Sequence, residues 1–254
     1  MKLLLVFPLL FSAACFAHNT FECESLLKKE FSRIPNDTFS GRISGRVPMS
    51  VQTLTEAYRR GIFPWELAAN GDAVWYSPPL RGVLDFATLK IPRKDMQFIR
   101  RELGGGTYSV TFDQAFSEVI RNCAETARLR KTLDGVESVE VGSWIVPEFQ
   151  HQFTEMFHAG FAHSVEVWKN GELVGGLYGT FVDGVFTGES MFHKESDVLK
   201  LALYALIERL KERGHTWIDT QQVNGLIKKW GGEKIPRPLF LNMLKAAQAQ
   251  SMPF

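Results

Sequence analysis

Two apolar stretches that are typical of buried strands carry polar side chains at their ends. Residues 186–192 read FTGESMF and residues 217–224 read WIDTQQVN, which places Glu189, Asp219 and Gln221 near those ends. A carboxylate costs free energy to bury unless it is paired or serves a function. The residues alone leave two interpretations open: an ion pair at the strand ends, or a catalytic group.

The segment from 163 to 222 supplies the elements that would position these side chains. HSVEVW, ELVGGLYGTF and VFTGESMF predict strands, and NG at 170–171 and DG at 183–184 are hairpin-turn signals. SDVLKLALYALIERLKERG predicts a helix capped by Ser196, and HTWIDTQQ predicts one more strand. This is the core order of the GNAT acyltransferase fold. In that fold the two strands joined by the helix splay apart, and the acyl donor enters between them.

The whole chain predicts an α+β protein, with a small N-terminal α/β domain followed by a GNAT-like acyltransferase domain. We expect the small domain over residues 18–80, because Pro78 and Pro79 close an aromatic, proline-rich zone, and the second domain over residues 81–254. Within the second domain, FDQAFSEVIRNCAE predicts a helix with Phe112 on its apolar face, and residues 127–143 predict a loop.

Residues 1–17 form a segment of their own. Lys2 is followed by an apolar run from Leu3 to Ala17, which is too short to span a bilayer comfortably and is interrupted by Pro8. This pattern is typical of a secretory signal peptide. A buried N-terminal element, or a start codon assigned too far upstream, would explain the same residues.

Composition adds little about function. The formal net charge is +1, so no global field favours a nucleic-acid or membrane partner. Basic groups such as RLRK at 128–131 are typical of solvated surface, although a nucleic-acid role stays open for them. No Cys-x-x-Cys pattern or Cys/His cluster predicts a metal site.

Motifs over most of the chain suggest a family. AYRRGIFPW, WYSPPLRGVL, AHSVEVW, LVGGLYG, FTGESMF and WIDTQQVN occur in this order. Together they resemble the leucyl/phenylalanyl-tRNA–protein transferases. The resemblance implies transfer of Leu or Phe from a charged tRNA to a protein N-terminus that bears Arg or Lys, which marks that protein for degradation.

The implied chemistry needs no cofactor, metal or Ser/Cys nucleophile. The donor is an activated ester, and an α-amine with a pKa of about 7.7–8.0 is partly neutral at pH 7. The resemblance implies that Asp219 orients Gln221, that Gln221 contacts the amine or the ester carbonyl, and that Glu189 holds the amine or the terminal ribose. Asp219→Ala is therefore expected nearly to abolish transfer and to leave the fold intact.

The resemblance also implies a set of substrate-binding residues. Its apolar members would line a slot that selects the donor side chain by size and tolerates Met beside Leu and Phe. Its tryptophans match family positions near the terminal adenosine of the tRNA. The set comprises Leu177, Phe186, Met191, Trp65, Trp144, Ser190 and Asn224.

The sequence departs from the family after Asn224, where a His and an SLGA stretch are replaced by Leu226 and KWGG. Two hypotheses therefore stand. The first is a cytoplasmic, monomeric aminoacyltransferase. The second is an exported relative, periplasmic or membrane-anchored, with a different acyl transfer or a non-catalytic binding role. A working signal peptide would favour the second hypothesis, because the mature protein would then meet no charged tRNA.

Overall fold

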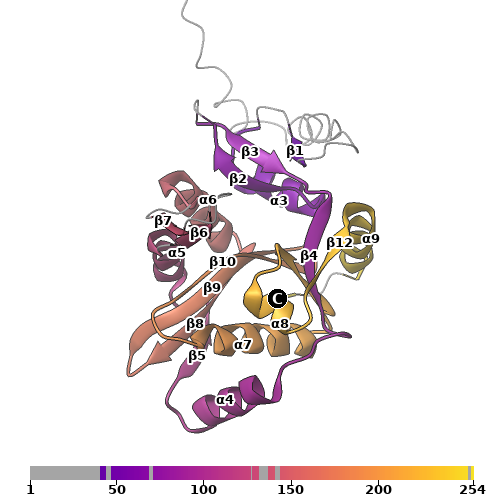
Figure 1. Cartoon of the computed structure of the whole chain (residues 1–254). Coiled ribbons are helices and arrows are strands. Elements are labelled where there is room, and N and C mark those ends of the chain that lie inside the picture. Colours follow the sequence, from indigo (N-terminus) through magenta and orange to yellow (C-terminus); the bar gives the residue numbers. More distant parts are fainter. Residues whose placement is uncertain are drawn as a thin grey trace, which may run out of the picture.

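The computed structural model describes residues 41–43, 47–68, 71–126, 128–131, 137–140, 144–250 and 253–254 (Figure 1). The signal-like segment 1–17 lies outside the described residues, so its function stays a prediction. Within the described ranges no helix is long and apolar enough to cross a membrane.

A small sheet and one helix form the N-terminal part of the structure. Strands β1 (Arg42–Ile43), β3 (Ala73–Tyr76) and β2 (Phe63–Leu67) pair antiparallel in the order β1-β3-β2. Helix α3 (Val51–Arg59) begins after Ser50, whose hydroxyl accepts from the backbone N–H of Thr53 in a capping box. Figure 1 shows these elements together at one end of the molecule, above the large sheet.

A seven-stranded sheet forms the body of the protein. Its strands lie in the order β12 (Glu233–Pro236), β4 (Leu80–Asp85), β11 (Trp217–Gln221), β10 (Val185–His193), β9 (Glu172–Val182), β8 (Ala162–Lys169) and β5 (Ser109–Phe112). The predicted meander is confirmed: β8, β9 and β10 are antiparallel neighbours joined at 170–171 and 183–184. Helix α7 (Val198–Glu212) then crosses to β11, which runs parallel to β10. This order makes the protein α+β with a GNAT-like domain.

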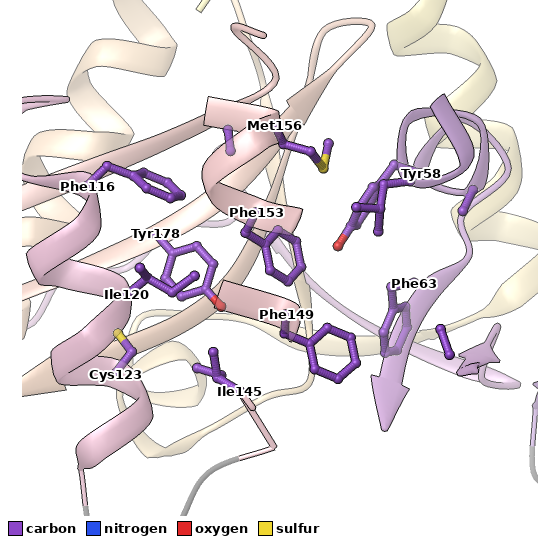
Figure 2. Packing of buried hydrophobic residues seen from close by; sticks show 14 of the residues in the cluster. Tyr58, Phe63, Phe116, Ile120, Cys123, Ile145, Phe149, Phe153, Met156 and Tyr178 are labelled. Carbon is purple, nitrogen blue, oxygen red and sulfur yellow. The ribbon is translucent and has the colours of Figure 1, made fainter. Parts of the chain in front are cut away.

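Helices cover both faces of this sheet. Helices α4 (Arg93–Gly104), α7 and α8 (Gly225–Lys229) share one apolar core with the sheet. Helices α5 (Phe116–Glu125) and α6 (Pro147–His158) belong to a second core that also includes residues of α3. Figure 2 shows Phe149 and Phe153 of α6 between Tyr178 of β9 and Tyr58 of α3. Helix α9 (Arg237–Gln248) packs beside β4 and β12. The N-terminal elements and the large sheet therefore share one core.

Three local predictions were wrong. Residues 127–143 include a two-stranded ribbon of β6 (Arg128–Lys131) and β7 (Glu137–Glu140), whose charged sequences lack the apolar alternation that signals a strand. Phe112 ends β5 and is not in a helix, because α5 begins only at Phe116. Helix α7 is preceded by Asp197 in a left-handed conformation (φ 70°), and no side chain caps it, so Ser196 is not its N-cap.

Asp95 ties together the helices on the α7 face. Its carboxylate accepts from Lys229 Nζ at 2.8 Å, Trp230 Nε1 at 3.0 Å and Lys200 Nζ at 2.9 Å. These donors come from the end of α8 and from α7, while Asp95 lies on α4. Burial alone would raise the pKa of Asp95, but the hydrogen bonds from Lys229, Trp230 and Lys200 lower it to about 2. The carboxylate is therefore ionised at neutral pH and holds α8 against α7.

We expect Asp95→Ala to lower the free energy of unfolding by about 2–4 kcal/mol, because the buried Trp230 Nε1 and the largely buried Lys200 lose a charged acceptor. Urea denaturation at pH 7 measures this change. The matched control is Glu172→Ala, which removes a carboxylate that is 68% exposed from its pair with Lys194, and it should cost at most about 1 kcal/mol. Equal losses in the two variants would contradict an anchoring role for Asp95.

Candidate active site

Strands β10 and β11 separate after a single paired position. Their register pair is Thr187 with Asp219, and beyond it each strand contains a bulge against its other neighbour. The extra residue in β10 is Glu189, between Gly188 and Ser190, and the extra residue in β11 is Thr220. A bulge re-aims side chains and ends regular pairing. The sheet therefore opens at this point.

A pocket of about 410 Å³ occupies the opening. Nine of the ten site residues predicted from the sequence line it, namely Glu189, Gln221, Trp65, Trp144, Leu177, Phe186, Ser190, Met191 and Asn224. Helix α7 contributes Leu203 and Leu206 to the lining, which the sequence analysis did not assign to the site. The pocket therefore combines apolar side chains from the sheet and α7, which form an apolar slot, with polar and tryptophan side chains.

Asp219, the tenth predicted residue, lies behind the pocket wall. Its side chain is 1% exposed and forms a two-pronged ion pair with Arg81 of β4, with Nε–Oδ1 at 2.8 Å and Nη2–Oδ2 at 2.6 Å. The Arg81 guanidinium also donates to the Gly61 carbonyl at 3.3 Å. It lies 4.3 Å from the ring centre of Phe63 and 4.7 Å from that of Phe240. These contacts compensate the desolvation of both charges.

The same carboxylate shapes the end of β11. Asp219 Oδ1 accepts from the backbone N–H of Gln221 at 2.9 Å, and Gln221 has a left-handed backbone (φ 55°). A bulky residue adopts that conformation only when its surroundings hold it there. The following residue, Gln222, runs so close to Gly82 that a Cβ at Gly82 would lie 2.7 Å from its backbone. Asp219 therefore forms the ion pair that was one of its two interpretations, and it also positions Gln221 through the backbone.

Two side chains donate hydrogen bonds to the Glu189 carboxylate. Its Oε1 accepts from the Tyr58 hydroxyl at 2.7 Å and from Gln221 Nε2 at 2.8 Å, whereas its buried Oε2 has no hydrogen-bond partner among the described residues. Burial raises the pKa of Glu189 to about 7, although the hydrogen bonds from Tyr58 and Gln221 act against this rise. A carboxyl with this pKa exchanges a proton readily at neutral pH.

Tyr58 and Arg81, the partners of Glu189 and Asp219, were not predicted as site residues. Tyr58 lies in the AYRRGIFPW motif and Arg81 in the WYSPPLRGVL motif, so the motifs contained both. Their partners are 131 and 138 positions away in the chain, which local patterns cannot reveal. Burial raises the pKa of Tyr58 well above its usual value, with a further contribution from Glu189, so its hydroxyl stays protonated and donates.

Two stacked indoles line the pocket. The rings of Trp65 on β2 and Trp144 are parallel within 3°, with centres 6.1 Å apart. Asn224 caps α8, since its Oδ1 accepts from the backbone N–H of Ile227 at 2.9 Å, and its Nδ2 lies 3.8 Å from Met191 Sδ. Asn224 therefore has a structural role in addition to bordering the pocket.

Comparison with known proteins identifies the family. Residues 83–245 match the family model described as leucyl/phenylalanyl-tRNA protein transferase, and residues 48–79 match the model of its N-terminal domain. The chain belongs to the leucyl/phenylalanyl-tRNA protein transferase family. It is an aminoacyltransferase, which favours the first of the two functional hypotheses.

Two curated leucyl/phenylalanyl-tRNA–protein transferases illustrate the similarity. The one from Pseudoalteromonas translucida is 40% identical over 200 residues, which cover 79% of this chain and 78% of the relative. The one from Syntrophobacter fumaroxidans is 41% identical over 196 residues, covering 77% and 78%. Among solved structures, a GCN5-related N-acetyltransferase-like protein from Streptococcus suis aligns with a TM-score of 0.34 and 13% identity, over 72% of this chain and 63% of that one.

The structure changes the expectation for Asp219→Ala, because this substitution leaves the Arg81 guanidinium buried without its partner. We predict a loss of about 3–5 kcal/mol in the free energy of unfolding. The double variant Arg81→Met with Asp219→Leu should regain at least about half of this loss, because it buries no charge. Its transfer rate should stay low, because the Gln221 N–H still lacks its acceptor.

Thermal or urea unfolding, together with a transfer assay, measures both effects. An Asp219→Ala protein as stable as the wild type would contradict the structural role of the ion pair. A fully active double variant would contradict the positioning of Gln221 by Asp219.

The raised pKa of Glu189 predicts a specific pH dependence of stability. Between the ordinary pKa of 4.5 and about 7, the folded state binds the proton and the unfolded state does not. The free energy of unfolding of the wild type should therefore fall as pH rises through this window, by up to about 3 kcal/mol relative to Glu189→Gln, since one pKa unit corresponds to about 1.4 kcal/mol. Parallel curves of stability against pH for the wild type and Glu189→Gln would contradict a raised pKa of Glu189.

Proposed function

We propose that this enzyme transfers Leu or Phe, and with lower efficiency Met, from charged tRNA to the N-terminal Arg or Lys of a protein and so marks it for degradation. The observation that carries the proposal is the single pocket at the β10–β11 opening. It joins an apolar slot, a pair of stacked indoles and the hydrogen-bonded Glu189–Gln221 pair.

The donor would be bound in two parts. Its side chain would enter the slot between Leu177 and Phe186, with Leu203 and Leu206 of α7 forming the far wall. Such a slot selects by size, and one methylene is worth only about 1–3 kcal/mol, which accounts for tolerance of Met. The terminal adenosine would stack against the Trp65–Trp144 pair, which contributes roughly 1–3 kcal/mol per base.

The reaction would follow from this placement. The neutral α-amine of the acceptor protein attacks the ester carbonyl carbon, a C–N bond forms, and the C–O bond to the terminal ribose breaks. The proton lost by the amine passes to Glu189 Oε2, which is unpartnered and belongs to a carboxyl whose pKa of about 7 lies near that of the amine. The ribose oxygen takes up that proton from Glu189 as it leaves, which restores the carboxylate. Gln221 fixes the Glu189 carboxylate through its hydrogen bond to Oε1.

These steps require neither a metal nor an organic cofactor, because the ester is already activated. The choice of N-terminal Arg or Lys and the monomeric state rest on the family resemblance. A cytoplasmic location follows from the donor, since charged tRNA is found there. Affinity for the tRNA should fall steeply with salt, because phosphate contacts dominate such binding.

The test is a transfer assay with the full chain. We expect tRNA charged with labelled Leu or Phe to label a peptide that begins with Arg, and not one that begins with Glu. Glu189→Ala should lower the rate by about 10²–10⁴-fold, as expected for loss of a proton-transfer group. The matched control is Glu172→Ala, an exposed carboxylate at the start of β9, which should retain full activity.

Failure of folded wild-type protein to label any peptide would contradict the proposal. It would favour the exported relative with another activity. Undiminished transfer by Glu189→Ala would support the proposed reaction but contradict the role of Glu189 in proton transfer.

A further inference from the structure

Thr220 occupies an unusual position in the pocket. It is the extra residue of the β11 bulge, between the buried Asp219 and the pocket residue Gln221, and it lines the pocket itself. Its Oγ1 is buried, and within the described part of the chain it has no hydrogen-bond partner. A buried hydroxyl without a partner costs free energy, so a ligand group that supplies one is favoured here.

Glu189 Oε2 is a second buried oxygen without a partner, and it too belongs to a residue that lines this pocket. The two residues lie on the two strands that separate at the opening, each one at a bulge. The proposed reaction brings two amines into the same space, one on the acceptor protein and one on the donor aminoacyl group. The carboxylate oxygen suits the acceptor amine, because that amine must lose a proton.

We propose that Thr220 Oγ1 accepts a hydrogen bond from the α-amino group of the donor and thereby selects aminoacyl over simple acyl donors. This inference rests on the proposed function and deepens it. The donor α-carbon carries the side chain, which enters the slot, and the ester, which faces Glu189 and Gln221. Its amino group must therefore point in a third direction.

Thr220 Oγ1 is one of several polar groups that line the pocket, and its position at the bulge favours it as the acceptor for that amino group. The slot itself is lined by hydrocarbon and thioether side chains, namely Leu177, Phe186, Met191, Leu203, Leu206 and Ile218. Glu189 Oε1 already accepts two hydrogen bonds, and Asn224 Oδ1 accepts from the start of α8. Thr220 Oγ1 lies at the opening and accepts from none of the described groups, so it fits the role.

The experiment compares two donors in wild type and two variants of the full chain. One tRNA carries phenylalanine, and the other carries 3-phenylpropionate, which has the same ring and ester but no amine. Thr220→Val removes the hydroxyl at nearly constant shape, whereas Thr220→Ser keeps it. The kcat/KM for transfer to an Arg-initiated peptide is measured for each pair, and unfolding curves verify that the variants are folded.

We expect wild type to prefer the phenylalanyl donor by about 10-fold or more, because a site built to hydrogen-bond an amine discriminates against the analogue that lacks it. Thr220→Val should lower kcat/KM for phenylalanine by about 10-fold, leave 3-phenylpropionate unchanged and so abolish the preference. Thr220→Ser should keep the preference.

Equal losses for both donors, or none for either, in Thr220→Val would overturn the inference and leave the proposed function standing. A wild type that transfers phenylalanine to no peptide would overturn the proposed function, and this inference with it. The two failures are therefore distinguishable.

Discussion

The buried ion pair between Arg81 and Asp219 is the interaction on which the rest of the site depends. Two desolvated charges are tolerated only if each finds a partner with good geometry. The guanidinium meets this condition with two hydrogen bonds to Asp219 and one to the Gly61 carbonyl, between the rings of Phe63 and Phe240. Because these groups come from β4, β11, β2, α9 and the end of α3, the ion pair joins the N-terminal elements to the large sheet.

The geometry of the pocket follows from that pair. Asp219 forms the one register pair of β11 with β10, and its carboxylate accepts from the backbone N–H of Gln221, which has a left-handed conformation at the end of the strand. The side chains of Gln221 and Tyr58 then both donate a hydrogen bond to Glu189 Oε1. Without the N-terminal elements the site would lack Tyr58 of α3 and Trp65 of β2, so these elements complete the site as well as the core.

The sequence predicts those features that local patterns specify. The NG and DG turns and the apolar strands between them predict the meander, and the helical pattern of SDVLKLALYALIERLKERG predicts α7. The opening between β10 and β11 is expected from the resemblance of this order to the GNAT fold. Motif resemblance finds nine residues that line one pocket, although their roles remain proposals. Long-range contacts are different: Arg81 with Asp219 and Tyr58 with Glu189 join segments more than 130 positions apart. No local signal distinguishes a carboxylate that faces the pocket from one that supports it from behind, and Asp219 belongs to the second kind.

We propose that the aminoacyl donor occupies the opening between β10 and β11. The most direct test is a crystal structure of the protein with phenylalanine joined by an amide to 3′-amino-3′-deoxyadenosine, which mimics the tRNA end and resists transfer. We expect the phenyl ring in the slot between Leu177 and Phe186 and the adenine against the Trp65–Trp144 pair. An analogue bound elsewhere, or with its adenine in the slot, would contradict it.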